Sequence, residues 1–155
     1  CDQQSFDKVV LLAPLIRPAA WQGVARLHSV VSPFLRVWHR TFSQNSSDVQ
    51  FVKFLKENDP LQSKWLAVDW VGALKEWIPR MEKLAGFKRK VAVVQGTSDA
   101  TVDWKHNLTV LRRLFQEVKI TYIEGGRHHL VNESAIKRVE AFEAILAELR
   151  GGLTS

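Results

Sequence analysis

Three short segments of the chain are almost continuously apolar, are rich in β-branched residues, and end at proline or glycine. They are KVVLLAP at 8–14, KVAVVQG at 90–96 and KITYIEGG at 119–126. Continuous apolar runs of this length are typical of strands that are buried on both faces of a parallel sheet, whereas strands with one solvated face alternate. The pattern therefore predicts three strands of a parallel sheet.

A helical pattern separates the last two of these segments. Apolar residues recur at helical spacing within DWKHNLTVLRRLFQE (103–117), at Trp104, Leu108, Leu111 and Phe115. Asp103 is a suitable N-cap for this helix. Residues 90–124 are therefore predicted to form a strand–helix–strand unit.

A further helix is expected after the last strand, over AIKRVEAFEAILAELR. Its apolar stripe consists of Ile136, Val139, Phe142 or Glu143, Leu146 and Leu149. Asn132 or Ser134 would cap its beginning, and the glycines at 151–152 would end it. A stripe of this kind normally faces the core.

The long interval 15–88 contains no convincing strand. One helical face is marked by Trp21, Val24, Leu27, Val31, Leu35, Trp38 and Phe42. Pro33 should kink or split that helix. A polar loop at 43–48 leads to Asp48 as the N-cap of a second helix, and DPLQ at 59–62 is predicted to be a turn. A third helix runs from Val68 to Met81 and is disturbed at Pro79.

These patterns divide the chain into a core, 1–14 and 89–155, and a helical insert at 15–88. An insert of about 70 residues is too long for an ordinary crossover connection.

Length and composition fit one soluble domain. The 155 residues are 46% hydrophobic and 25% charged. No apolar run approaches the roughly 18 residues that a membrane helix needs, and VVLLAPLIRP lacks the basic flank of a signal peptide. The single cysteine, Cys1, excludes an internal disulfide. A cytoplasmic location is therefore expected, with peripheral attachment to a membrane left open.

The net charge of +6 does not predict a nucleic-acid interface. A nucleic-acid binder usually gathers its cations on one stripe. Here the cations are spread along the chain, at Lys53, Lys56, Lys75, Arg80, Lys88, Arg89, Lys90, Arg112, Arg113, Lys137 and Arg138. Scattered cations of this kind form a solvated surface and allow attraction to an anionic membrane.

Titratable side chains follow two of the predicted strands. Asp99 comes just after the second strand, and His128 and His129 come just after the third. The two strands flank one helix, so their carboxyl ends should deliver a carboxylate and an imidazole to the same edge of the sheet. In such a pair, the carboxylate orients the ring and the second ring nitrogen takes a proton from a nucleophile. Spacing alone leaves open that Asp99 caps a turn and that the histidines are ordinary loop residues.

The order of these motifs resembles the C-terminal half of an α/β-hydrolase. The resemblance is closest to the serine hydrolases described as monoacylglycerol lipases and lysophospholipases, which carry a helical cap. It rests on GTSD at 96–99, GGRHHL at 125–130 with the nearby Glu133, the strand FDKVVLLAP and the turn DPLQ. It implies an α/β fold: the C-terminal part of an α/β-hydrolase parallel sheet, with three strands and a helical cap insert.

The resemblance also implies roles for two residues. In this family a G-x-x-D motif supplies the acid of the catalytic triad, and a G-x-x-H-x-L motif supplies the base. Asp99 is then the acid and His128 the base, because His128 is the fourth residue from Gly125. His129 matches no functional position and is expected to pack or hydrogen-bond locally. Asp103 is expected to cap a helix.

The chain departs from the family in one respect. The family nucleophile lies in a G-x-S-x-G elbow between a strand and a helix, and no such pentapeptide occurs here. None of the candidate serines has that context: Ser5, Ser29, Ser32 and Ser98. The order serine, acid, histidine in the family places the nucleophile and its oxyanion hole before Cys1. We therefore expect a fragment that is inactive by itself and that pairs with the missing N-terminal part of the same protein.

The implied reaction is hydrolysis of a small acyl ester of lipid type, resembling a monoacylglycerol or a lysophospholipid. The aromatic residues of the insert would line an acyl pocket or form the insert's own core: Trp21, Trp38, Trp65, Trp70, Trp77, Phe34, Phe42, Phe51 and Phe54. No organic cofactor is expected. A metal site is not expected either, because one cysteine and two adjacent histidines give poor ligand geometry. The rival hypothesis is a non-catalytic module that uses the cap groove to bind an apolar ligand or a partner.

Overall fold

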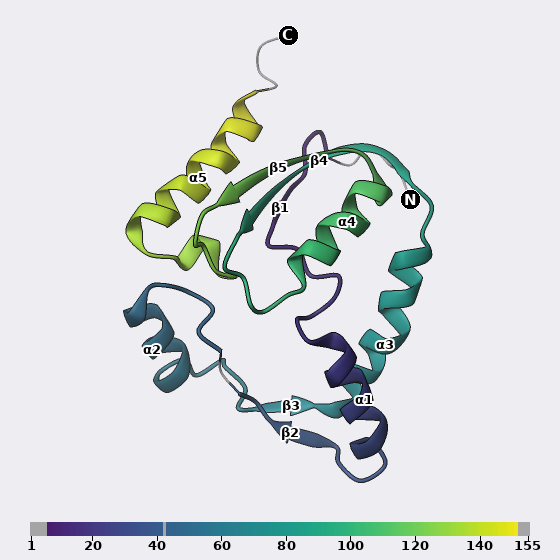
Figure 1. The fold of residues 1–155 in the computed structure, drawn as a ribbon. Helices are drawn as coiled ribbons and strands as arrows, with labels where there is room; N and C mark the ends of the chain where they lie inside the picture. Colours follow the sequence, from purple (N-terminus) through teal and green to yellow (C-terminus); the bar gives the residue numbers. More distant parts are fainter. Residues whose placement is uncertain (1–5, 42, 152–155) are drawn as a thin grey trace.

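A three-stranded parallel sheet forms the core of the fold and lies in the upper half of the view in Figure 1. The structure is a computed structural model that describes residues 6–41 and 43–151; Cys1, Ser5, Phe42 and Gly152 lie outside them. The strands are β1 (Val10–Leu12), β4 (Phe87–Gly96) and β5 (Phe115–Ile123), in the order β1-β4-β5. The predicted α/β fold class with three parallel strands is confirmed.

Each face of the sheet carries its own apolar core, because successive side chains of a strand point to opposite faces. Val93 packs with Leu108 and Leu111 of α4 (Trp104–Leu114) on one face. Val94 packs with Ile123 and with Ala141 of α5 (Ala135–Arg150) on the other face. The continuous apolar run in β4 is thus explained by burial on both sides.

The helix α4 is shorter than predicted. It begins after Asp103, whose carboxylate accepts a hydrogen bond from the backbone of His106, so the predicted cap is confirmed. It ends at Leu114, and Phe115, expected on the helical stripe, is the first residue of β5 and pairs with Phe87. At this boundary, pairing with the long strand β4 places Phe115 in a strand, although its spacing in the sequence fits the helix.

The predicted apolar stripe of α5 faces outward, which corrects the sequence prediction. Ile136 is 76% exposed, whereas Ala141 is 0% exposed. The side that packs on the sheet is formed by Ala141, Ala144 and Ile145. Small residues allow the helix to approach the strands closely, and the helix is apolar on more than one side, so spacing alone did not identify the buried side.

The described part of the insert contains three helices. They are α1 (Trp21–Val31), α2 (Val49–Glu57) and α3 (Val68–Lys83). The Asp48 carboxylate accepts from the backbone N–H of Phe51, which confirms the predicted N-cap of α2. The chain leaves α1 just before Pro33, whereas Pro79 lies inside α3 and the helix continues past it.

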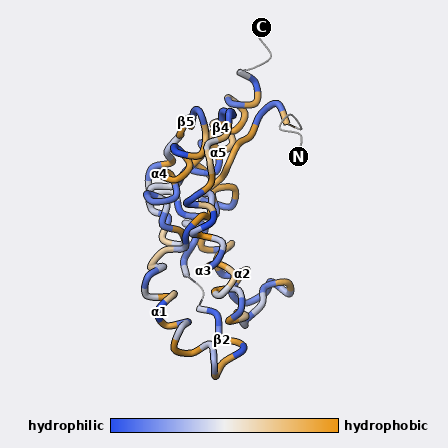
Figure 2. The backbone as a smooth tube through the Cα atoms, turned by 90° about the vertical axis from the view of Figure 1, so that its right-hand side faces the viewer, coloured by the Kyte–Doolittle hydropathy of each residue, from blue (hydrophilic) through white to orange (hydrophobic). Residues whose placement is uncertain are grey.

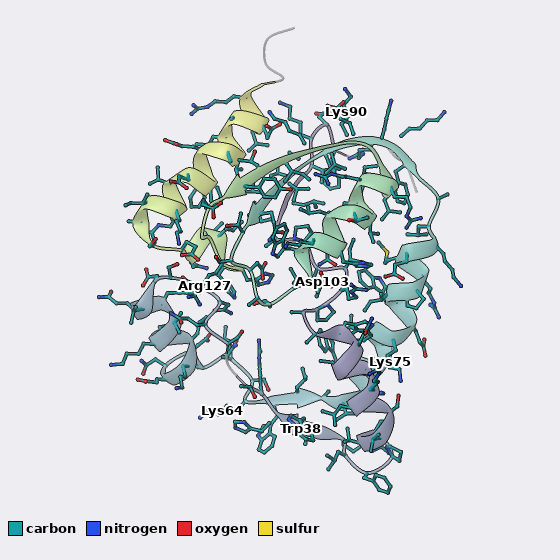
Figure 3. The ribbon with its side chains drawn as sticks, in the orientation of Figure 1. Trp38, Lys64, Lys75, Lys90, Asp103 and Arg127 are labelled. Carbon is teal, nitrogen blue, oxygen red and sulfur yellow. The ribbon has the colours of Figure 1, made fainter. Side chains whose placement is uncertain are left out.

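The insert also contains two strands, although no strand was predicted there. They are β2 (Val37–His39) and β3 (Trp65–Ala67), which pair antiparallel with Trp38 opposite Leu66. Trp38, expected on the first helix, lies on β2 (Figure 3). Each strand has three residues, which is too short for a periodicity to be visible, and its pairing partner is distant in sequence.

Most of the insert lies beyond the end of the sheet at which β4 and β5 finish (Figure 1). The C-terminal part of α3 is the exception, because it runs beside α4, where Met81 packs on the core and Glu82 pairs with His106. In the side view of Figure 2, α1, β2 and α2 lie below the strands β4 and β5. The loops that leave β4 and β5 therefore face the insert.

Among residues 6–41 and 43–151, no helix is both long and apolar enough to cross a bilayer.

Candidate active site

The loops that follow β4 and β5 approach each other through glycines. Thr97 N donates to Ile123 O at 3.1 Å, and Ser98 N donates to Gly126 O at 2.9 Å. A Cβ atom on Gly96 would collide with the backbone carbonyls of Gly126 and Arg127. Gly125 has φ +62°, a left-handed conformation that glycine adopts without strain. These two turns bring the ends of the strands together.

The structure brings Asp99 and His128 into contact. His128 Nδ1 lies 2.9 Å from Asp99 Oδ2, and the side chains are 24% and 0% exposed, respectively. With the carboxylate ionised, the ring nitrogen donates its proton to it. This tautomer leaves Nε2 as an acceptor for the proton of a nucleophile. The expected meeting of a carboxylate and an imidazole at one edge of the sheet is observed.

The second oxygen of Asp99 is held by the backbone. Thr101 N donates to Oδ1 at 2.8 Å, and Val102 N donates to it at 3.2 Å. Burial acts to raise the pKa of Asp99, but the hydrogen bond and charge of His128 and the two backbone N–H groups outweigh burial and lower that pKa. Asp99 is therefore a carboxylate that stays ionised and fixed.

Gln95 is a part of this site that sequence reasoning did not identify. It is completely buried, and its Nε2 donates to Asp99 Oδ2 at 3.3 Å and to Gly96 O at 3.0 Å. Gln95 thus donates to the same oxygen that accepts the hydrogen bond from His128. The sequence contains one indication of this role, the amide side chain of Gln95 within the otherwise apolar strand KVAVVQG. A polar side chain buried in such a strand needs a hydrogen-bond partner.

His129 lies between the site and the insert. Its backbone N–H donates to Asn45 O at 2.9 Å, and its ring packs edge-on against Phe51 of α2 and against His128. Burial lowers the pKa of His129, as do the nearby charges of His128 and Arg40, whereas Asp99 acts to raise it. The expected local packing and hydrogen bonding of His129 are observed.

Glu133 is fully buried close to His128. Its carboxylate accepts the backbone N–H of Arg127 at 2.8 Å, of Ser47 at 2.9 Å and of Ser134 at 3.1 Å. Burial alone would raise the pKa of Glu133, but these hydrogen bonds lower it. Sequence reasoning noted this residue as part of a motif but assigned no contact to it.

Serine hydroxyls of the described residues make no hydrogen-bond contact with this pair. Within 6–41 and 43–151, no serine hydroxyl is hydrogen-bonded to His128. The same residues contain no cluster of three or more His, Cys, Asp or Glu side chains that could hold a metal ion.

Two different cavities lie in or beside the insert. One, of about 330 Å³, is lined mostly by polar residues, among them Arg40, Asn45, Lys56 and Thr101. It adjoins the site, because Thr101 N binds Asp99 and Asn45 O binds His129 N. The other, of about 200 Å³, is apolar and is formed by α1, the β2–β3 pair and α3. Its lining is Val24, Leu27, His28, Val31, Trp38, Leu66, Val68 and Val71.

Comparison with protein families gives one match over most of the chain. Residues 1–135 match the family described as "Serine aminopeptidase, S33". A search of curated proteins finds no match.

Several solved structures share the fold at low sequence identity. The monoacylglycerol lipase of Paleococcus ferrophilus superposes with a TM-score of 0.69 at 18% identity, covering 90% of this chain and 58% of that one. A soluble variant of the monoglyceride lipase of Saccharomyces cerevisiae, in complex with a substrate analogue, gives 0.71 at 15% identity, with 92% and 55% covered. DcsB in complex with its substrate analogue gives 0.62 at 17% identity, with 96% and 57% covered. The chain thus spans little more than half the length of these structures.

Proposed function

The chain belongs to the Serine aminopeptidase, S33 family of hydrolases, and on this premise we propose that it is the C-terminal part of a serine hydrolase that cleaves carboxylic esters of lipids. The observation that carries the proposal is the contact between His128 Nδ1 and the buried carboxylate of Asp99. The two residues lie at the ends of neighbouring parallel strands, where active sites of such sheets are found.

The proposed reaction is acyl transfer through a serine supplied by the upstream part of the protein. The serine oxygen attacks the ester carbonyl carbon while His128 Nε2 accepts the hydroxyl proton. The tetrahedral intermediate collapses to an acyl-enzyme, and His128 returns that proton to the departing alcohol. Water then attacks the acyl carbon, gives its proton to His128 and releases the acid, after which the proton returns to the serine. Asp99 orients the ring and stabilises its charged form throughout.

The apolar cavity of the insert favours a lipid acyl group over a peptide. Its lining consists of apolar side chains apart from His28, and it lies in the segment proposed to cap the site. A monoacylglycerol and a lysophospholipid both present one acyl chain and a polar head. We propose substrates of this class, and no cofactor takes part in the proposed steps.

We further propose that two surfaces have partners. The edge of β1 that pairs with no described strand and the exposed apolar side of α5 would be covered by the N-terminal part of the same protein. The end of the insert near α1 exposes Val30, Phe34 and Val37, with Phe34 84% exposed. Together with the scattered cations, these side chains would attach the protein peripherally to an anionic membrane. The proposed setting is therefore the cytoplasmic side of a membrane, with no nucleic acid bound.

The decisive experiment uses the full-length protein that contains this chain. Its sequence before Cys1 should contain a G-x-S-x-G elbow, a fluorophosphonate probe should label that serine, and a monoacylglycerol or lysophospholipid should be hydrolysed. A full-length protein that has the elbow but neither reacts with the probe nor cleaves these esters contradicts the proposal.

The second candidate function is a binding module on a hydrolase scaffold. It is favoured by one observation: within the described residues 6–41 and 43–151, no serine hydroxyl is hydrogen-bonded to His128. A residue other than serine at the elbow position upstream, together with binding of a fatty acid to the insert, would decide in its favour.

A further inference from the structure

The buried carboxylate of Glu133 joins two parts of the chain that are far apart in sequence. Its Oε1 accepts from Arg127 N, the residue directly before His128. Its Oε2 accepts from Ser47 N, which belongs to the insert and is 86 positions away. One ionised side chain thus receives backbone hydrogen bonds from the loop that carries the base and from the segment that leads into α2.

A set of further hydrogen bonds ties the same two segments together. The fully buried Ser46 donates its hydroxyl to Asn132 O at 2.6 Å, and that hydroxyl accepts from Asp48 N at 2.9 Å. The guanidinium of Arg127, labelled in Figure 3, donates to Gln44 O at 2.6 Å. Lys137 Nζ bridges Ser47 Oγ and Gly125 O, at 3.2 and 2.6 Å. Segment 44–48 is therefore attached to segment 125–137 at several points.

His128 lies between two of these attachments. Arg127 N, on one side, is bound to Glu133, and His129 N, on the other side, is bound to Asn45 O at 2.9 Å. A displacement of the reacting groups by about 1 Å is enough to reduce turnover by roughly 100-fold. The placement of the imidazole against Asp99 therefore depends on how this loop is held.

We propose that Glu133 is a positioning residue, which fixes His128 against Asp99 and seats the insert on the loop that carries the base. This inference rests on the proposed function, since it assigns a role in the same site. Glu133 does not touch the reacting atoms. It acts through the backbone on both sides: Arg127 N in the loop and Ser47 N in the insert.

The chemistry of the group explains why a carboxylate is needed. Three backbone N–H donors converge on its two oxygens. An ionised carboxylate only accepts, so it can satisfy all of them. A glutamine has one accepting oxygen, and its NH₂ group would face either Arg127 N or the pair of N–H groups from Ser47 and Ser134. Glu133→Gln should therefore release one of the two segments while keeping the volume of the side chain.

The experiment compares Glu133→Gln with Glu124→Gln in the full-length hydrolase. Glu124 is a matched control, because it is an exposed acid in the same loop region whose Oε1 accepts from Thr97 Oγ1. Active sites are counted with a fluorophosphonate, kcat per labelled site is measured, and the imidazole proton of His128 that is bound to Asp99 is followed by NMR. For Glu133→Gln we expect kcat per site to fall by roughly 10- to 100-fold and the His128 resonance to broaden or disappear. Glu124→Gln should leave both unchanged.

A purely structural role predicts a different result. Glu133→Gln would then lower the unfolding temperature, but the folded fraction would keep its kcat per site and its His128 resonance, and this outcome overturns the inference. If Glu133→Gln does not fold, Glu133→Asp is measured in the same way. Aspartate keeps the negative charge, but its side chain is one methylene shorter, which moves the carboxylate away from the three backbone N–H groups. Wild-type protein that neither reacts with the probe nor hydrolyses esters would contradict the proposed function, and the His128 resonance would still decide the role of Glu133.

Discussion

Asp99 and His128 are 29 positions apart in sequence, and their Oδ2 and Nδ1 atoms are 2.9 Å apart in the fold. Two neighbouring parallel strands and two glycine-containing turns produce this contact. The carboxylate is buried and is held by Thr101 N, Val102 N and the His128 ring. The ring is therefore oriented before any substrate or nucleophile is present.

The first prediction concerns this pair. In the full-length hydrolase, Asp99→Asn and His128→Ala should each reduce kcat by about 10⁴-fold, because the base is lost or held in the wrong tautomer. His129→Ala and Asp103→Asn should cost far less, since these residues pack against α2 and cap α4. Steady-state kinetics on an acyl ester measures all four. If His129→Ala were inactive and His128→Ala active, the catalytic base would be His129 and not His128.

The second prediction concerns residues 1–155 alone. The isolated chain should show no serine labelling by a fluorophosphonate and no hydrolysis of p-nitrophenyl acyl esters, because no described serine is bound to His128. Intact-mass spectrometry after incubation with the probe measures the labelling. Stoichiometric modification of a serine within the chain would show that the nucleophile is not upstream.

The third prediction is a pH dependence of stability due to His129. Its pKa in the folded protein is lowered from the ordinary value of 6.5, first by burial and then by the charge of His128. The unfolded chain therefore binds more protons between the two pKa values, so stability should fall as pH decreases from about 6.5 toward the folded-state pKa. Denaturant unfolding of the full-length protein at a series of pH values measures this slope. His129→Phe should flatten the slope, and an unchanged slope would assign it to other groups.

The fourth prediction concerns the close approach of the two turns. Gly96→Ala should destabilise the full-length protein by about 1–3 kcal/mol or more, because the new methyl group would collide with backbone carbonyls that cannot rotate away. Gly23→Ala is the control: it lies in α1 with open space around the added methyl group, and it should stabilise by roughly 0.5–1 kcal/mol. Chemical denaturation compares the two. Equal effects would mean that the turns are free to separate.

The fifth prediction concerns the association state of residues 1–155. One edge of β1 has no partner among the strands of residues 6–41 and 43–151, and the apolar side of α5 is exposed, with Val139 54% exposed. Both features should make the isolated chain self-associate or unfold readily. A net stability of only ~5–15 kcal/mol cannot compensate for many such exposed groups. Sedimentation velocity and thermal unfolding measure this, and Val139→Lys should reduce association. A monodisperse wild-type monomer with one cooperative transition well above room temperature would contradict the prediction.

Local patterns in the sequence were sufficient for the elements whose signal is contained in a short window. The strands at 8–14, 90–96 and 119–126 were recognisable because burial on both faces demands continuous apolar residues. The caps at Asp48 and Asp103 were recognisable because a short polar side chain before a helical stripe satisfies free N–H groups. The proximity of Asp99 and His128 followed from the direction of parallel strands, without any knowledge of side-chain contacts.

Only the tertiary structure decided the features that depend on distant partners. The strands β2 and β3 exist because each supplies the other's backbone hydrogen bonds. The buried side of α5 is the alanine side, because close packing on the sheet selected small residues over the larger apolar stripe. Gln95 donates a hydrogen bond to Asp99, and Glu133 accepts one from Ser47. No periodicity in the sequence predicts these contacts. Hydrophobic spacing reports which side chains avoid water, whereas the partners of a buried polar group are determined by where the chain returns in space.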